Sequence, residues 1–270
     1  MSNRNGDEWA IARQSGQPLD RVRFALDRLT EKGLAAQKTK NYIIYAAGFD
    51  ILALKYYADH QSVSSLGKII AKGKESDVYE VLTDGGELLA LKFFRLGRTS
   101  FRGVTRRRFT GTRESYNWAS KNYQSAKREF KALKKLEGIS EHIPGVISFN
   151  RHTLLLEEVL GVRLANRPEL HDASGMLKEI LLTMRKIYIK ASMISADLSE
   201  YNVLTEGSRF WFIDWPQAVS AAHPNARMLL SRDVGAIVNF FRRGYGFSAD
   251  GKEAVDYVLG ATKEPKIRRV

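Results

Sequence analysis

Two stretches decide how this chain folds: Asp197-Leu198-Ser199-Glu200-Tyr201-Asn202 and Ile213-Asp214-Trp215-Pro216-Gln217, whose Asp lies twelve residues after that Asn. Between them lie an apolar pair, a polar turn at 206–208 and an apolar segment at 210–213. This pattern predicts two short strands joined by a turn. The spacing therefore sets an Asp, an Asn and a second Asp around one point.

Those three residue types suit the chemistry of a metal-bound nucleotide. Asp197 is expected to accept a hydrogen bond from an attacking hydroxyl or water, while Asn202 and Asp214 ligate Mg²⁺ that bridges phosphates. The alternative is turn chemistry, in which Asp197 only caps the loop that follows it. An Asp and an Asn five residues apart are common by chance, but the same pair followed by two short strands is not. The sequence favours the metal–nucleotide interpretation.

Composition limits the classes of protein that fit. The chain has 270 residues, of which 44% are hydrophobic, so we expect a globular fold with a sizeable core. It has no run of eighteen apolar residues and no apolar signal segment at its start, so we expect a cytoplasmic protein outside any membrane. There is no Cys, and the five His have no zinc-ligand spacing. The expected metal is a hard, oxygen-bound ion, Mg²⁺ or Mn²⁺.

The net charge of +13 is concentrated in one segment. Residues Arg95 to Arg113 contain seven Arg and no Asp or Glu, a composition that attracts polyanions. Aromatic residues that suit base stacking are interleaved with them or follow them: Phe101, Phe109, Tyr116 and Trp118. We predict a flexible basic loop at 95–118 that binds nucleic acid. The alternative is a solvated loop whose charge only aids solubility.

Residues 1–62 predict a winged helix-turn-helix domain. An amphipathic helix starts near Pro18 and stops at Gly33, a hairpin turns at 39–41, and a closing helix covers 49–56. Basic residues on the second helix and in the wing are expected to face a phosphate backbone: Arg21, Arg23, Arg28, Lys32, Lys38 and Lys40. Residues 1–62 contain nine Lys and Arg and seven Asp and Glu, a small positive charge for a nucleic-acid-binding domain. Docking to another protein is therefore an equal alternative.

Residues 63–157 predict a first lobe that holds phosphates. A turn between two strands carries Lys74 and Ser76 and is expected to cover phosphates, although it lacks the usual glycine pattern. The strand 88–94 carries Lys92 inside an apolar run, where the alternative is an edge lysine that reaches solvent. A helix from about 120 to 137 carries Glu129 beside its buried stripe, and we expect this carboxylate to pair with Lys92. The alternative is a surface Glu that pairs with neighbouring Lys and Arg.

The last segment of this lobe is the expected binding site for the adenine base of the nucleotide. Residues 151–161 form an apolar strand that runs into a polar turn, where the backbone of Glu157 to Val159 is expected to hydrogen-bond the base. A long amphipathic helix follows at 177–188, and its apolar residues are interpreted as core. Residues 158–270 then make up the second lobe.

Several of these motifs together resemble the RIO family of atypical protein kinases, and the winged-helix pattern points to its second subfamily, Rio-two. The motifs are Gly73-Lys74-Glu75-Ser76-Asp77-Val78-Tyr79, Leu91-Lys92-Phe93, Arg95-Leu96-Gly97-Arg98-Thr99-Ser100-Phe101-Arg102 and the two stretches quoted first. The resemblance extends from about Trp9 to Gly246. It implies an α+β fold, namely a truncated two-lobed protein-kinase-like fold preceded by a winged helix-turn-helix domain. It also implies Mg-ATP binding, serine/threonine kinase or ATPase activity, and work on small ribosomal subunit maturation with pre-ribosomal RNA and proteins as partners.

The resemblance also assigns roles to single positions. Ser76 matches the phosphate-contacting serine, Lys92 the phosphate lysine and Glu129 its partner. Asp197 matches the catalytic aspartate, and Asn202 and Asp214 match the metal ligands. The aspartate matching Asp214 is also implicated as a phosphate acceptor. This chain departs from the family where Ser195-Ala196 replaces the usual His-Gly and Trp215 replaces Phe.

Three hypotheses for the function follow. Only 56 residues follow Asp214, with no activation-segment motif, which favours an ATPase-like switch that times release from pre-ribosomal RNA. A small-molecule phosphotransferase of the aminoglycoside or choline type is one alternative, because it shares D-x-x-x-x-N and I-D-W. A nucleotide-gated RNA-binding assembly factor with little catalysis is the other, and Ser195-Ala196 supports it.

Overall fold

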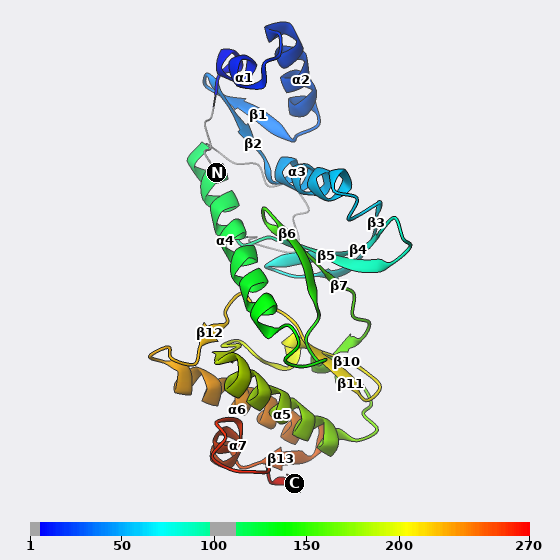
Figure 1. The fold of residues 1–270 in the computed structure, drawn as a ribbon, viewed down its shortest axis with the longest axis vertical. Coiled ribbons are helices and arrows are strands. Elements are labelled where there is room, and N and C mark those ends of the chain that lie inside the picture. The colour runs from blue at the N-terminus through cyan, green and yellow to red at the C-terminus, as the bar shows by residue number, and fades with distance from the viewer. Residues whose placement is uncertain (1–5, 98–111) are drawn as a thin grey trace. The chain divides into compact units, whose positions relative to one another are not determined.

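The computed structural model describes residues 6–97 and 112–270 (Figure 1). The chain forms two compact units, the first from residues 1–126 with 148–155 and the second from 127–147 with 156–270. Mixed helices and strands in these units agree with the predicted α+β class. None of the helices within the described ranges combines the length and apolar character needed to cross a membrane.

The N-terminal module has the predicted order of elements. It consists of α1 (Glu8–Ser15), α2 (Leu19–Glu31), the hairpin strands β1 (Ala35–Lys38) and β2 (Asn41–Ile44), and α3 (Ala46–Asp59). Asp7 caps α1, since its Oδ1 accepts from the Ala10 amide at 2.8 Å. Arg23 of α2 lies 2.7 Å from Glu8, so this predicted phosphate contact is engaged in an ion pair of the module itself.

Helix α3 joins the core of a five-stranded sheet. The strands are β3 (Ser65–Lys72), β4 (Ser76–Leu82), β5 (Leu88–Phe94), β6 (Val146–Asn150) and β7 (Thr153–Glu157), in the order β3-β4-β5-β7-β6. One buried cluster unites the helix with the sheet: Tyr57, Val63, Val81, Leu89, Leu91, Phe93 and Leu155. The Ser64 amide donates to the Leu82 carbonyl at 2.7 Å, so the segment after α3 continues directly into the sheet.

Helix α4 (Thr112–Leu136) starts eight residues earlier than the predicted start at 120. Residues 112–118 are therefore helical and not part of a flexible loop, which corrects the predicted loop 95–118. Trp118 is only 4% exposed and packs on Phe49 and His152, so it is not a base-stacking residue. Burial of Trp118 against the N-terminal module explains why this polar stretch folds as helix. The rest of the predicted loop, 98–111 with Phe101 and Phe109, lies outside the described residues.

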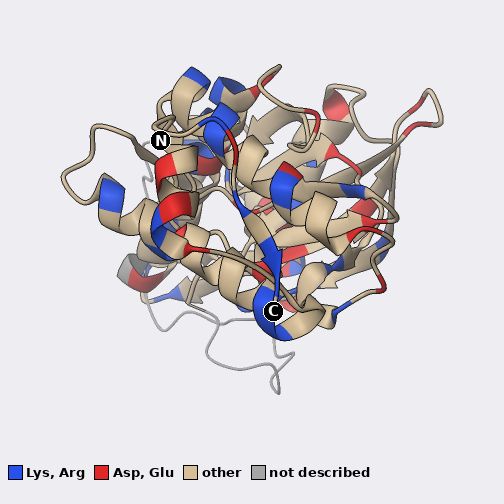
Figure 2. Cartoon of the chain, turned by 90° about the horizontal axis from the view of Figure 1, so that it is seen from below, with Lys and Arg blue, Asp and Glu red and all other residues tan. Residues whose placement is uncertain are grey.

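The second unit carries the remaining helices and short sheets. Its helices are α5 (Ala173–Ala191), α6 (Ala226–Tyr245) and α7 (Gly251–Val258), with 3₁₀ turns η1 (Leu164–Asn166) and η2 (Glu200–Asn202). Its strands are β8 (Val162–Arg163), β9 (Met193–Ile194), β10 (Val203–Glu206), β11 (Arg209–Phe212), β12 (Val219–Ser220), β13 (Phe247–Ala249) and β14 (Ile267–Arg269). Lys and Arg are interspersed with Asp and Glu over the described chain (Figure 2).

Candidate active site

The loop between β9 and β10 meets the end of β11, and this brings together the three polar residues that the spacing predicts. The Asn202 side chain donates from Nδ2 to the Asp197 carbonyl at 2.9 Å and so closes the loop on itself. The Ile213 amide donates to the Asn202 carbonyl at 3.0 Å, which brings the residue after it, Asp214, to the same place. The structure therefore places Asp197, Asn202 and Asp214 together within the second unit.

Strand pairing explains this convergence. In the β10–β11 hairpin, Val203 lies opposite Phe212 and Glu206 opposite Arg209. Asn202 and Ile213 therefore meet at the open end of the hairpin. Asp214 follows with φ of 65°, in the left-handed region that non-glycine residues rarely adopt. Such backbone conformations cluster at functional sites because surrounding contacts hold them.

The electrostatics of Asp197 suit a proton acceptor. Partial loss of hydration raises the pKa of its carboxyl group, Arg232 opposes this rise, and the negative charge of Asp214 adds to it. A raised pKa makes a carboxylate a stronger base. It also brings the pKa closer to the working pH, where general-base catalysis is most efficient.

Asp233 of α6 is a site residue that the sequence analysis missed. Its side chain is 1% exposed, and burial raises its pKa to about 6 although Arg232 and the Leu198 and Ala196 amides lower it. Arg232 donates to the Ala196 carbonyl and lies 3.4 Å from Asp233 Oδ1. Helix α6 thus supports the loop of Asp197. The signal in the sequence was a single carboxylate beside the apolar residues Leu230, Val234 and Ile237.

The Ser195-Ala196 departure has a physical consequence. Ala196 adopts φ of 58°, a left-handed conformation that favours glycine because a Cβ is crowded there. Ser195 and Asp233 help to line a small, partly open pocket of about 20 Å³, together with Leu198 and Trp215. Asp233 Oδ2 faces no hydrogen-bond partner among the described residues. Ala196 therefore holds a backbone conformation that glycine adopts at lower cost.

The predicted phosphate turn lies in the first unit. Gly73-Lys74-Glu75 connects β3 to β4, and the Gly73 amide donates to the Ser76 carbonyl at 2.8 Å. Lys74 is exposed and Ser76 is half-buried at the start of β4. The turn is closed by its own backbone and leaves both side chains at the end of the hairpin.

Lys92 and Glu129 are both buried, at 4% and 2% exposure. Lys92 lies on β5, where it pairs with Val78 of β4. Because β5 is an inner strand between β4 and β7, the alternative of an edge lysine is wrong. The alternative of a surface Glu is wrong for Glu129, because its position on α4 is inaccessible to solvent. The two residues belong to different units, so their ion pair stays a prediction.

The predicted base-binding backbone is partly engaged within the second unit. The Glu157 amide donates to the Gly145 carbonyl at 2.9 Å, and the Gly145 amide donates to Glu157 Oε2 at 2.8 Å. A base would therefore meet the Glu157 carbonyl and the backbone of Val159, but not the Glu157 amide.

The donor set fits a magnesium ion that shares its ligands with phosphates. Because Asn202 donates through Nδ2, its amide oxygen is the group left to face a metal beside the Asp214 carboxylate. Among the described residues no group of three or more His, Cys, Asp or Glu could hold a metal. Mg²⁺ typically takes one or two protein oxygens and completes its shell with phosphates and water.

Comparison with known proteins gives consistent matches. The RIO domain family model matches residues 77–254. The RIO-type serine/threonine-protein kinase Rio2 of Methanocaldococcus jannaschii is 32% identical, over 93% of this chain and 97% of that protein. The serine/threonine-protein kinase RIO2 of Caenorhabditis elegans is 33% identical over 83% of this chain, which spans only 42% of that protein.

Solved structures agree with the sequence matches. The crystal structure of the Rio2 kinase–ADP/Mg²⁺–phosphoaspartate complex from Chaetomium thermophilum superposes with a TM-score of 0.77 and 28% identity. That match covers 91% of this chain and 81% of the other. A second structure of the Chaetomium thermophilum Rio2 kinase gives a TM-score of 0.75.

Proposed function

The chain belongs to the RIO family of serine/threonine protein kinases, and from this premise we propose that it turns over Mg-ATP through a phosphorylated Asp214. The observation that carries the proposal is the left-handed conformation of Asp214 at the end of β11, beside Asp197 and Asn202. A similar solved kinase was captured as an ADP/Mg²⁺–phosphoaspartate complex, which supports the same chemistry here.

The proposed reaction has two steps. One Asp214 carboxylate oxygen attacks the γ-phosphorus of ATP, the bond to the β-phosphate oxygen breaks, and ADP leaves. Water then attacks the phosphoryl group while Asp197 takes its proton, which restores Asp214 and releases phosphate. Magnesium held by Asn202 and the other Asp214 oxygen neutralises phosphate charge.

The remaining predicted residues hold the substrate in this proposal. Lys74 and Ser76 cover the phosphates, and Lys92 binds them with Glu129 as its partner. The backbone of Glu157 to Val159 binds the base. The burial of Lys92 and Glu129 supports these roles, because a buried ammonium and a buried carboxylate each need a charged or polar partner.

We further propose that this turnover serves maturation of the small ribosomal subunit, with pre-ribosomal RNA and proteins as partners. The support is the net charge of +13 and the acid-free segment 95–113. Affinity for small-subunit RNA should fall steeply as salt rises from 50 to 200 mM, because each phosphate contact releases counterions. A flat salt response would contradict RNA binding through charge.

Steady-state phosphate release tests the proposed reaction. We expect Asp214→Asn to abolish ATP turnover, while Asp84→Asn, a matched change in an exposed turn, leaves it at the wild-type rate. Unchanged turnover in Asp214→Asn would exclude the phosphoaspartate route. Equal and negligible release by wild type and Asp197→Ala would favour a nucleotide-gated binding protein instead.

A further inference from the structure

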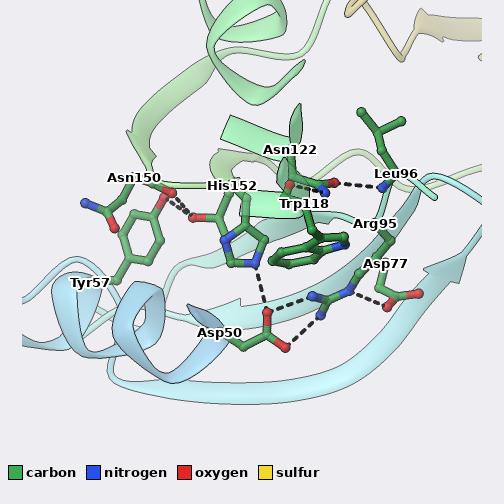
Figure 3. A network of polar contacts seen from close by, with 10 residues as sticks. Asp50, Tyr57, Asp77, Arg95, Leu96, Trp118, Asn122, Asn150 and His152 are labelled. Carbon is green, nitrogen blue, oxygen red and sulfur yellow. Dashed lines mark hydrogen bonds and ion pairs between the residues drawn. The ribbon is translucent and has the colours of Figure 1, made fainter. Parts of the chain in front are cut away.

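Arg95, which the sequence analysis assigned to an RNA-binding loop, lies in a buried ion network of the first unit (Figure 3). Its Nε donates to Asp77 Oδ2 at 3.0 Å, and Nη1 and Nη2 donate to both oxygens of Asp50 at 2.7 and 3.1 Å. The side chain is only 13% exposed, so the prediction that Arg95 contacts nucleic acid is wrong for this residue.

His152 completes the network. Its Nε2 donates to Asp50 Oδ1 at 2.8 Å, and the ring packs against Trp118 with centroids 5.3 Å apart. Burial lowers the pKa of His152, which keeps the imidazole neutral near pH 7 despite the Asp50 carboxylate. The four residues come from α3, β4, the end of β5 and the β6–β7 turn, so one cluster ties these elements together.

The network is attached to the phosphate turn at two points. The Arg95 amide donates to the Glu75 carbonyl at 2.6 Å, directly at the turn Gly73-Lys74-Glu75. The guanidinium group also holds Asp77, two residues further along β4. Ser76 lies between these two anchored residues and pairs across the sheet with Phe94, the residue before Arg95.

Asp50 attaches the same network to the N-terminal module. It lies on α3, whose Tyr57 is fully buried in the sheet core and bonds Thr153 Oγ1 at 3.0 Å. The next residue, Leu96, is also fixed, because its amide donates to Asn122 Oδ1 on α4 at 2.7 Å. A shift of α3 would therefore act on Arg95 through a bidentate pair and not through a flexible contact.

We propose that Arg95 and Asp50 are positioning residues that hold the Gly73–Glu75 turn in its phosphate-binding shape, so that nucleotide affinity depends on helix α3 of the N-terminal module. This inference rests on the proposed Mg-ATP site, of which the turn is one part. It assigns a role to the winged-helix region besides recognition of a partner: the region completes the support of the nucleotide turn.

Conservative variants test the proposal. Asp50→Asn keeps the shape but removes the charge, and Arg95→Lys keeps the charge but loses the bidentate geometry. Asp59→Asn is the matched control, because Asp59 lies on the same helix but its pair with Lys55 is exposed. Calorimetric titration measures the affinities for Mg-ATP and adenosine, and thermal denaturation verifies that each variant is folded.

We expect both network variants to weaken Mg-ATP binding about tenfold, the size of one lost charge-assisted hydrogen bond. Adenosine affinity should stay unchanged, because adenosine has no phosphates for the turn to hold, and Asp59→Asn should match wild type. Equal losses for Mg-ATP and adenosine, or wild-type Mg-ATP affinity in the folded variants, would overturn the positioning role. Absence of Mg-ATP binding by wild type would instead overturn the proposed function itself.

Discussion

The pKa of a carboxylate is shifted in opposite directions in the two units of this protein. In the first unit, Asp50 faces a bidentate arginine and a histidine, and these partners outweigh burial and hold its pKa below the usual value. In the second unit, Asp233 is buried and Asp197 is exposed at the loop surface, and loss of hydration, full at Asp233 and partial at Asp197, is the largest cause of the raised pKa of each. Fully paired charges build a support, whereas incompletely compensated carboxylates mark the place where protons are exchanged.

Breaking the paired network should give the largest effect on stability. Arg95→Met removes the guanidinium group from buried Asp77 and half-buried Asp50, so we expect a loss of about 3–5 kcal/mol in the free energy of unfolding. Urea denaturation measures it. Arg209→Met removes an exposed pair with Glu206 and should cost less than about 1 kcal/mol. Similar losses in the two variants would contradict a supporting role for the network.

Replacement of Asp197, the proposed general base, should lower the rate of ATP turnover and leave the stability of the fold unchanged. Asp197→Asn is expected to lower the rate of ATP turnover by about 10²–10⁴-fold, because general-base catalysis supplies an acceleration of that size. The urea midpoint should stay near that of wild type, since Asp197 is exposed at the loop surface. A strongly destabilised variant with normal turnover would reverse the contrast between the two units.

The contributions of Asp233 and Asp50 to stability should change in opposite directions as pH rises. The pKa of Asp233 is raised to about 6 when folded, so its contribution to stability falls as pH rises from about 4 to 6. The stability of Asp233→Asn relative to wild type should therefore rise by up to about 3 kcal/mol over this range. The pKa of Asp50 is lowered, so its contribution is present above about pH 4 and is lost as pH falls further.

Urea denaturation at several pH values between 4 and 7 checks this prediction. Asp256→Asn serves as the control, because Asp256 lies on the α7 surface in a weak contact, 4.0 Å from Arg227. If Asp233→Asn and Asp256→Asn have parallel stability curves, the ionisation of Asp233 does not strain the folded loop.

The smallest effect should come from the backbone of the catalytic loop. Ala196→Gly removes a Cβ from a left-handed residue, and we expect a gain of about 0.5–1 kcal/mol in stability. Ala25→Gly is the opposite control, since glycine in the exposed interior of α2 should lose about 1 kcal/mol. Thermal denaturation of both variants tests this prediction. A loss of stability in Ala196→Gly would show that the alanine conformation is not strained.

The sequence predicted those features that depend on local pattern. The β5 strand around Lys92, the 13-residue α2 and the β10–β11 hairpin between Asn202 and Asp214 are close to prediction, because apolar periodicity and turn residues act over short distances. The Arg95 network could not be predicted, because its members lie at positions 50, 77, 95 and 152 and meet only in the folded chain. Asp233 was missed for the same reason, since its partners belong to a loop that lies 35 residues earlier or more.

The central claim is that Asp214 carries the phosphoryl group. Intact-mass measurement after brief incubation with Mg-ATP, followed by peptide mapping, tests it directly. We expect one added phosphoryl group on wild type, located at Asp214, removed by hydroxylamine as an acyl phosphate, and absent from Asp214→Asn. Turnover of Mg-ATP by wild type with no acyl phosphate at any time point, or with the label on another residue, would contradict the account.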